Sequence, residues 1–154
     1  MAKSIRILLS IAAWYNYEIW QMDVKTAFLN GFVEEKIFMD QSEGYSAVGE
    51  EQKVWLLQKS IYGLKQASRS WNTRFDEVIR GYDFSKNDYD PCVYKKISGS
   101  SVAYLVLYVD DILLIGNDVG DIKAWLSTQF SMKDMGEASY ILDIKIYRDN
   151  LGGC

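Results

Sequence analysis

The residues best able to do chemistry are two adjacent aspartates, Asp110 and Asp111, which stand between two strongly apolar runs. Neighbouring carboxylates repel each other, and apolar flanks solvate them poorly, so keeping both ionised without a counter-charge costs free energy. A divalent cation removes that repulsion, and carboxylate oxygens are the ligands that hard cations prefer. The pair therefore predicts a metal-dependent site, of the kind in which two ions about 4 Å apart promote phosphoryl transfer.

Such a site normally needs a third carboxylate from another strand, and Asp23 is the candidate. It ends the segment Ile19-Trp20-Gln21-Met22, which has the composition of a strand. Each of these observations also has a plain structural interpretation. An Asp-Asp pair suits a hairpin turn, and an aspartate at the end of a strand often caps the helix that follows.

Composition removes several other classes of site. The chain has 154 residues and no histidine, so the commonest general base and transition-metal ligand is absent. Cys92 and Cys154 lie far apart and form neither a zinc spacing nor a disulfide framework. We therefore expect a reducing, intracellular setting and a metal held by carboxylates. The apolar run Ile5–Trp14 is too short to span a bilayer, so neither secretion nor membrane insertion is expected.

The net charge of −4 is unfavourable for a protein that binds nucleic acid, but the charges are unevenly spread. Residues 53–80 contain six cations and two anions, whereas residues 34–51 contain six anions and one cation. A basic surface beside an acidic one is therefore expected, and it leaves nucleic-acid binding open.

The first half of the chain predicts a helix, a strand and a hairpin. Apolar spacing predicts a helix over 4–15 and a strand over 18–24 that delivers Asp23 at its end. A short helix over 26–30 is expected to stop at Gly31. Two strands, 37–40 and 54–59, are predicted to form a hairpin around an acidic stretch over 41–52.

The second half predicts two helices and three strands. One helix should bury a single apolar face and stop at Gly81, and a later one should be capped by Asp121. Strands over 102–109 and 112–115 should form a hairpin with the acidic pair at or near its turn. The buried residues expected in these helices, and in a further strand over 140–147, are Trp71, Phe75, Val78, Tyr82, Ile122, Trp125, Leu126, Phe130, Tyr140, Leu142, Ile144 and Ile146.

Taken together, these segments predict an α+β fold with an antiparallel sheet backed by helices, as a single domain over 1–154. Three stretches, 21–31, 60–71 and 108–113, resemble the catalytic motifs of copia-type retrotransposon reverse transcriptases, the first of them closely, and 132–137 resembles the segment after the third motif. The sequence is most similar to plant elements. The four stretches stand in the family's order and cover nearly the whole chain. The resemblance implies the palm and partial fingers of an RNA-directed DNA polymerase, truncated at both ends.

The resemblance also implies roles for individual residues. Asp23, Asp110 and Asp111 match the metal-binding carboxylates, with the carbonyl of Val24 as a further ligand of two Mg²⁺ ions, or of Mn²⁺. Phe28 matches the steric gate that favours deoxynucleotides, and Ala27 and Gln66 match residues at the incoming nucleotide. The residues expected near the template and primer are Lys65, Arg69 and Tyr108.

The implied partners are an RNA or DNA template-primer, deoxynucleoside triphosphates, and the rest of a Pol polyprotein with its ribonuclease H and integrase. The expected location is a cytoplasmic virus-like particle or the nucleus. Two positions depart from the family, because Ser68 replaces a proline and Asp143 replaces a glycine. Together with a missing fingers segment, they keep open an inactive retroelement remnant. A nucleotidyl cyclase is a further alternative, but it would need neither Phe28 nor the 63–71 motif.

Overall fold

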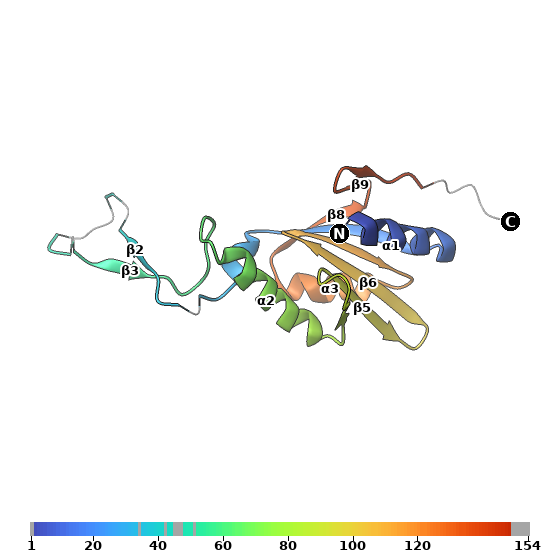
Figure 1. Ribbon diagram of the computed structural model, residues 1–154, viewed down its shortest axis with the longest axis horizontal. Coiled ribbons are helices and arrows are strands. Elements are labelled where there is room, and N and C mark those ends of the chain that lie inside the picture. The colour runs from blue at the N-terminus through green and yellow to red at the C-terminus, as the bar shows by residue number, and fades with distance from the viewer. Residues whose placement is uncertain (1, 34, 42, 45–47, 51, 149–154) are drawn as a thin grey trace. The chain divides into compact units, whose positions relative to one another are not determined.

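The computed structural model describes residues 2–33, 35–41, 43–44, 48–50 and 52–148. The chain divides into two compact units, one formed by 1–25 with 79–154 and the other by 26–78 (Figure 1). Each unit is described by itself below. Within the described residues, no helix combines the length and the apolar character needed to cross a membrane.

The first unit is built on a six-stranded sheet in the order β4-β5-β6-β7-β1-β8, with every pairing antiparallel. This confirms the α+β class and the antiparallel sheet predicted from the sequence. The strand predicted over 18–24 is confirmed, and the hairpin predicted around the acidic pair is formed by β6 and β7. The strands are β1 Glu18–Val24, β4 Ser85–Lys86, β5 Val93–Ser98, β6 Ser101–Tyr108, β7 Asp111–Gly116 and β8 Met132–Glu137.

One face of this sheet is covered by helix α1, Ala2–Tyr15, as the apolar spacing predicts. Ile5, Leu8 and Ala12 recur at steps of three and four, so they share one side of the helix and are buried together. They pack in one apolar cluster with four sheet residues and one residue of the C-terminal segment, namely Val93, Val106, Leu113, Ile115 and Ile141. This core holds β7 in the centre of the sheet.

The opposite face carries helix α3, Gly120–Gln129, which buries Ile122 and Leu126. Lys123 lies over the Trp20 ring at 3.6 Å from its centroid and forms an ion pair with Asp134 at 2.7 Å. Because Trp20 belongs to β1 and Asp134 to β8, this lysine ties α3 to both strands.

The expected cap of α3 is wrong. The N-cap residue is Val119, which makes no side-chain capping bond, and Asp121 lies inside the first turn. Val119 is buried, so packing sets the start of the helix in place of a capping side chain. Asp121 still favours the helix, because its negative charge lies near the positive end of the helix dipole.

The strand predicted over 140–147 is also wrong, because the chain folds back on itself there. Strands β9 Tyr140–Ile141 and β10 Ile144–Lys145 pair antiparallel around Leu142 and Asp143. Ile141, at 5% exposure, is the buried side chain of this hairpin, whereas Tyr140 is exposed. The predicted alternation fails only at these two residues, because Leu142, Ile144 and Ile146 are half-buried against the core as predicted.

The second unit contains the short helix η1 Ala27–Asn30, the strands β2 Phe38–Asp40 and β3 Val54–Leu56, and most of helix α2 Ala67–Arg80. β2 and β3 form the predicted hairpin, although both strands are shorter than expected. Residues 42, 45–47 and 51 of the acidic stretch between them lie outside the described residues, as does Cys154. Gly31 follows η1, where a Cβ atom would lie 2.9 Å from atoms of Ser70, so only glycine fits this approach to α2.

Helix α2 ends before Gly81, as predicted, but its buried stripe differs from the prediction. Trp71 and Phe75 are buried as expected, and Ile79 is buried where Val78 was predicted. Tyr82 follows the helix and stacks on Trp125 with ring centroids 4.1 Å apart. The actual stripe keeps a constant step of four residues, which follows one face of the helix.

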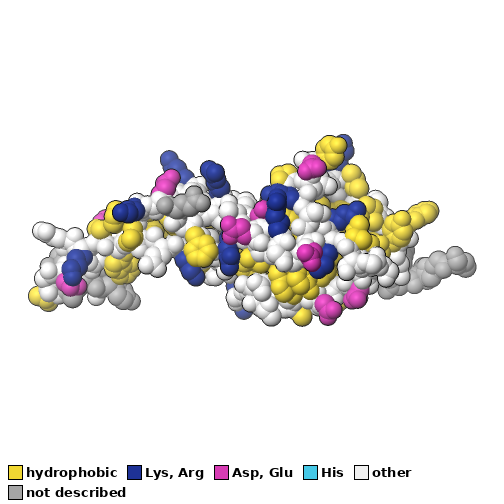
Figure 2. All heavy atoms as spheres, turned by 90° about the horizontal axis from the view of Figure 1, so that it is seen from below, with side chains coloured by type: hydrophobic (Ala, Val, Ile, Leu, Met, Phe, Trp, Pro, Cys, Tyr) yellow, Lys and Arg dark blue, Asp and Glu magenta, His cyan; other side chains and the backbone are white. Residues whose placement is uncertain are grey.

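The β2–β3 hairpin exposes many apolar side chains. Figure 2 shows them in yellow at the left of the view, where this hairpin lies. The exposed large apolar residues are Phe38, Val54, Trp55 and Leu56.

Candidate metal centre

The acidic pair is presented by a two-residue turn between β6 and β7. Tyr108 is paired with Asp111, which leaves Val109 and Asp110 as the turn residues. Val109 has φ 55°, a conformation that costs a β-branched residue roughly 1–3 kcal/mol. The backbone N–H of Val24 donates a hydrogen bond of 2.8 Å to the Asp110 carbonyl, which anchors this turn to the end of β1.

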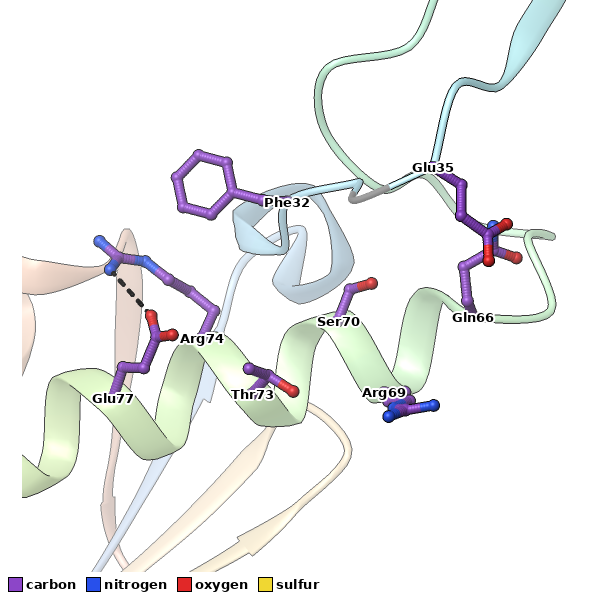
Figure 3. Close-up of a pocket in the computed structure, with 8 residues that line it drawn as sticks. All are labelled: Phe32, Glu35, Gln66, Arg69, Ser70, Thr73, Arg74 and Glu77. Carbon is purple, nitrogen blue, oxygen red and sulfur yellow. Dashed lines mark ion pairs between the residues drawn. The ribbon is translucent and has the colours of Figure 1, made fainter.

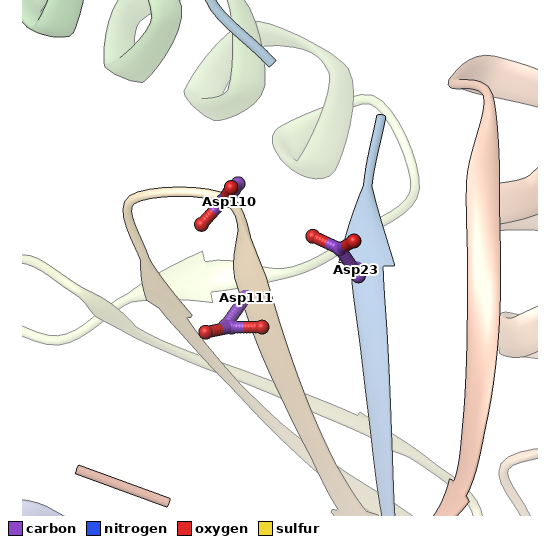
Figure 4. Close-up of side chains that lie close together, drawn as sticks. All are labelled: Asp23, Asp110 and Asp111. Carbon is purple, nitrogen blue, oxygen red and sulfur yellow. The ribbon is translucent and has the colours of Figure 1, made fainter. Parts of the chain in front are cut away.

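The turn brings three carboxyl groups together. Asp23 and Asp111 are direct partners in the β1–β7 ladder, so their side chains lie on the same face of the sheet. One carboxylate oxygen each of Asp23, Asp110 and Asp111 lies within 4.8 Å of the other two (Figure 4). These oxygens are therefore close enough to one another to approach one common cation.

The electrostatics of the cluster favour a bound cation. The pKa of Asp111 is raised, first by burial and then by the negative charge of Asp110, with a smaller contribution from Asp23. A hydrogen bond from the Gln21 side chain acts in the opposite direction. The donors are carboxylates alone, half-buried, with no nitrogen or sulfur ligand, and this set fits a hard divalent cation.

A cavity of about 360 Å³ adjoins the cluster. Asp111, Gln21 and Tyr108 line it on one side, and residues 140–143 of the β9–β10 hairpin line it on the other. Tyr108, predicted to lie near nucleic acid, is 43% exposed there. Sequence reasoning missed Gln21 and Tyr140. The sequence does contain an indication for Gln21. It stands two residues before Asp23 in the predicted strand, and strand periodicity places both side chains on one face.

The predicted ligand set also includes the backbone carbonyl of Val24. Its side chain is buried at 1% exposure, and its N–H is used by the Asp110 carbonyl. The role of its own carbonyl remains a prediction.

The predicted nucleotide-binding residues lie in the second unit. Ala27 is fully buried, and Phe28 is half-buried with its ring centroid 4.7 Å from that of Tyr62. Thr26, just before them, has φ 48°. The contact with Tyr62 restrains the Phe28 ring, and sequence reasoning did not identify this aromatic partner.

The basic side of α2 lines a cavity of about 370 Å³ (Figure 3). Gln66, Arg69 and Arg74 belong to its lining, while Lys65 is exposed just before the helix. The Arg74 guanidinium lies over the Phe32 ring at 5.5 Å and 3.9 Å from Glu77. The lining also contains Glu35 and Glu77, so its two guanidinium groups are balanced by two carboxylates.

The structure therefore brings Asp23, Asp110, Asp111 and Tyr108 together in the first unit. Val24 belongs to the first unit as well, and the remaining predicted site residues, which are Ala27, Phe28, Lys65, Gln66 and Arg69, belong to the second unit.

Comparison with known proteins agrees with the motifs. The family described as reverse transcriptase (RNA-dependent DNA polymerase) matches residues 1–153. The chain is 47% identical over 150 residues to the retrovirus-related Pol polyprotein from transposon TNT 1-94 of Nicotiana tabacum, which covers 95% of this chain and 11% of that protein. It is 36% identical over 148 residues to the corresponding polyprotein from transposon RE1 of Arabidopsis thaliana, covering 94% of this chain and 10% of that protein.

A more distant relative is the putative transposon Ty5-1 protein of Saccharomyces cerevisiae. It is 31% identical over 134 residues, covering 85% of this chain and 44% of that protein. The chain thus spans about a tenth of the plant polyproteins and less than half of the yeast protein. No solved structure matches it. The resemblance to copia-type reverse transcriptases predicted from the motifs is confirmed.

Proposed function

We propose, on the premise that this chain belongs to the reverse transcriptase (RNA-dependent DNA polymerase) family, that it forms the palm and partial fingers of a retrotransposon RNA-directed DNA polymerase. The observation that carries the proposal is the meeting of Asp23, Asp110 and Asp111, which are distant in the sequence, at one place in the first unit.

In this proposal the three aspartates and the Val24 carbonyl hold two Mg²⁺ ions, or Mn²⁺. When bound, the ions would activate the primer hydroxyl and neutralise charge on the triphosphate. The protein's own contribution is to fix its carboxylates in advance. Asp23 and Asp111 are fixed by a paired register, and Asp110 by an anchored turn, so little reorganisation is needed during reaction.

The second unit is proposed to select and place the substrates. Phe28, restrained by Tyr62, would exclude a ribose 2′-hydroxyl, while Ala27 and Gln66 would contact the incoming deoxynucleotide. Lys65 and Arg69, with Tyr108 of the first unit, would contact the template and primer. Because phosphate contacts carry no base information, such an enzyme would copy any template.

One observation favours an inactive remnant as the alternative. Asp143, where the family has glycine, has φ 62°, and Leu142 beside it has φ 45°. A two-residue hairpin with positive φ at both positions strongly prefers glycine at the second one. The substitution therefore weakens a hairpin that lines the cavity next to Asp111.

Primer extension on an RNA template with Mg²⁺ tests the proposal. We expect little or no extension by this chain alone, because it spans about a tenth of the plant relatives and would need the rest of the Pol polyprotein. Restoring the flanking segments should give extension that Asp23→Asn abolishes and that Phe28→Ala extends to ribonucleotides.

Robust extension by the isolated chain would refute the need for its flanks. Extension that survives Asp23→Asn would refute the metal centre. Activity that returns only when Asp143→Gly is added to the restored protein would favour the decayed element.

A further inference from the structure

We propose that Gln21 is a positioning residue for Asp111, whose carboxylate its side-chain amide holds in place beside Asp23 and Asp110. This inference rests on the proposed metal centre and assigns to it a residue outside the ligand set.

The sheet register places Gln21 where this role requires it. Asp23 is paired with Asp111, and Gln21 is paired with Leu113, two residues further along each strand. Side chains two residues apart on a strand share a face, so Gln21 is the diagonal neighbour of Asp111 across the ladder. The Gln21 side chain acts on the Asp111 carboxyl as a hydrogen-bond partner that lowers its pKa, and both side chains line the same cavity.

Gln21 also stands at a boundary on that face of the sheet. Ile19, two residues before it, and Leu113, its partner in the ladder, belong to the apolar cluster beneath α1, whereas two residues after it the face carries the carboxylates of Asp23 and Asp111. Gln21 is half-buried, so its apolar stem has neighbours and its amide loses little further freedom in binding Asp111. A carboxylate has two oxygens, and an amide that occupies one leaves the other for a cation.

The type of donor matters for a metal site. A lysine or arginine at this position would neutralise the cluster and compete with the cation for it. A neutral amide fixes the orientation of the carboxylate without adding positive charge. Partners of this kind, which orient ligands without touching the metal, typically change metal affinity by about 10- to 100-fold when they are removed.

Mn²⁺ binding to this chain, followed by the electron paramagnetic resonance signal of the free ion, tests the inference. Gln21→Met keeps the size of the side chain and removes the donor, and we expect it to weaken Mn²⁺ binding about 10-fold or more. Gln21→Asn keeps the amide on a shorter stem and should give an intermediate loss. The matched control is Gln129→Met, at an exposed position at the end of α3, which should bind as the wild type does.

Each outcome is informative. Graded weakening from glutamine to asparagine to methionine, with unchanged thermal unfolding temperatures, supports positioning, because a merely structural role would change folding and affinity together. If Gln21→Met does not fold, the Mn²⁺ affinity of Gln21→Asn is compared with that of the wild type, and weaker binding supports the inference. If the wild type binds Mn²⁺, Asp23→Asn abolishes binding, and both Gln21 variants bind like the wild type, the inference fails and the metal centre stands. If the wild type does not bind Mn²⁺, the metal centre fails, and the inference fails with it.

Discussion

The β6–β7 turn and the β9–β10 turn have the same length and a similar sequence, but they differ in backbone conformation and in support. Val109 alone has positive φ in the first turn, whereas Leu142 and Asp143 both have it in the second. Each has two residues with an aspartate second, and each begins with a branched residue at positive φ, Val109 at 55° and Leu142 at 45°. The first joins two central strands of a six-stranded sheet, with β1 paired alongside, while the second closes a ladder of only two residue pairs.

This difference in support shows which surroundings can keep a residue in an unfavourable backbone conformation. An unfavourable conformation persists when its surroundings determine it, and such conformations gather at functional sites. At the first turn, the hydrogen bond from Val24 and the long ladders on both sides supply that support. The supported turn holds Asp110 beside the other two aspartates. At the second turn the same kind of strain has little support, so we expect it to reduce stability without placing any ligand.

The largest expected effect comes from making one chemical change in both turns. Asp110→Asn removes a proposed metal ligand, and we expect it to lower primer extension by about 100-fold or more, the scale of losing one preorganised charge-stabilising group. Asp143→Asn removes an exposed charge at a position where asparagine also tolerates positive φ, so extension should change little. Both are measured with the flanking segments restored, and equal losses in the two variants would remove the distinction.

A smaller effect is expected from relaxing the first turn. Val109→Gly relieves the positive φ but lets the turn sample other conformations. We expect Mn²⁺ affinity to fall by about 10-fold, comparable to the loss of a residue that orients a ligand. Titration of this chain with Mn²⁺ measures it. Affinity equal to that of the wild type would show that the strain at Val109 has no part in placing Asp110.

Relieving the positive φ at the second turn should change the stability of the fold and leave Mn²⁺ binding unchanged. Asp143→Gly removes the strain of a side chain at φ 62°, and we expect a gain of about 1 kcal/mol in the free energy of unfolding. Chemical denaturation measures this, with Asp118→Gly as the control, because Asp118 is exposed and not at positive φ. An equal gain in the control would attribute the effect to the lost charge.

The smallest effect concerns pH. The raised pKa of Asp111, due first to burial and then to Asp110, means that the folded state holds this proton more tightly than the unfolded chain does. The resulting stability is present below the ordinary value of 3.8 and is lost as the pH rises through the folded pKa. As the pH rises from 3.8 through the folded pKa, the free energy of unfolding of Asp111→Asn should therefore increase relative to that of the wild type. Mg²⁺ should reduce this difference in stability, because it would bind the wild-type carboxylate. A difference in the free energy of unfolding between Asp111→Asn and the wild type that does not change with pH would contradict this prediction.

The two turns also show what the sequence could reveal. The β6–β7 hairpin was predictable, because long apolar runs flank a polar pair and a turn is the one way to bring adjacent aspartates to one site. The β9–β10 turn was not predicted, because the glycine that would mark it is Asp143 in this chain. Without that mark, the alternation over 140–147 is typical of one continuous strand.

Other errors arose where packing overrides local signals. The position of Asp121 predicts a cap, but the burial of Val119 sets the start of α3. Tyr82 continues the apolar period of α2, yet it leaves the helix and stacks on Trp125. The meeting of the three aspartates was predicted from residue type and spacing and from the family motifs, whereas the place of Gln21 beside Asp111 depends on a strand register that periodicity alone does not give.

Anomalous scattering from crystals of this chain grown with Mn²⁺ would test the central claim most directly. We expect a peak in contact with carboxylate oxygens of Asp23 and of at least one aspartate of the β6–β7 turn. A peak that involves other residues, or none at millimolar Mn²⁺, would contradict the claim that these three side chains form a metal centre.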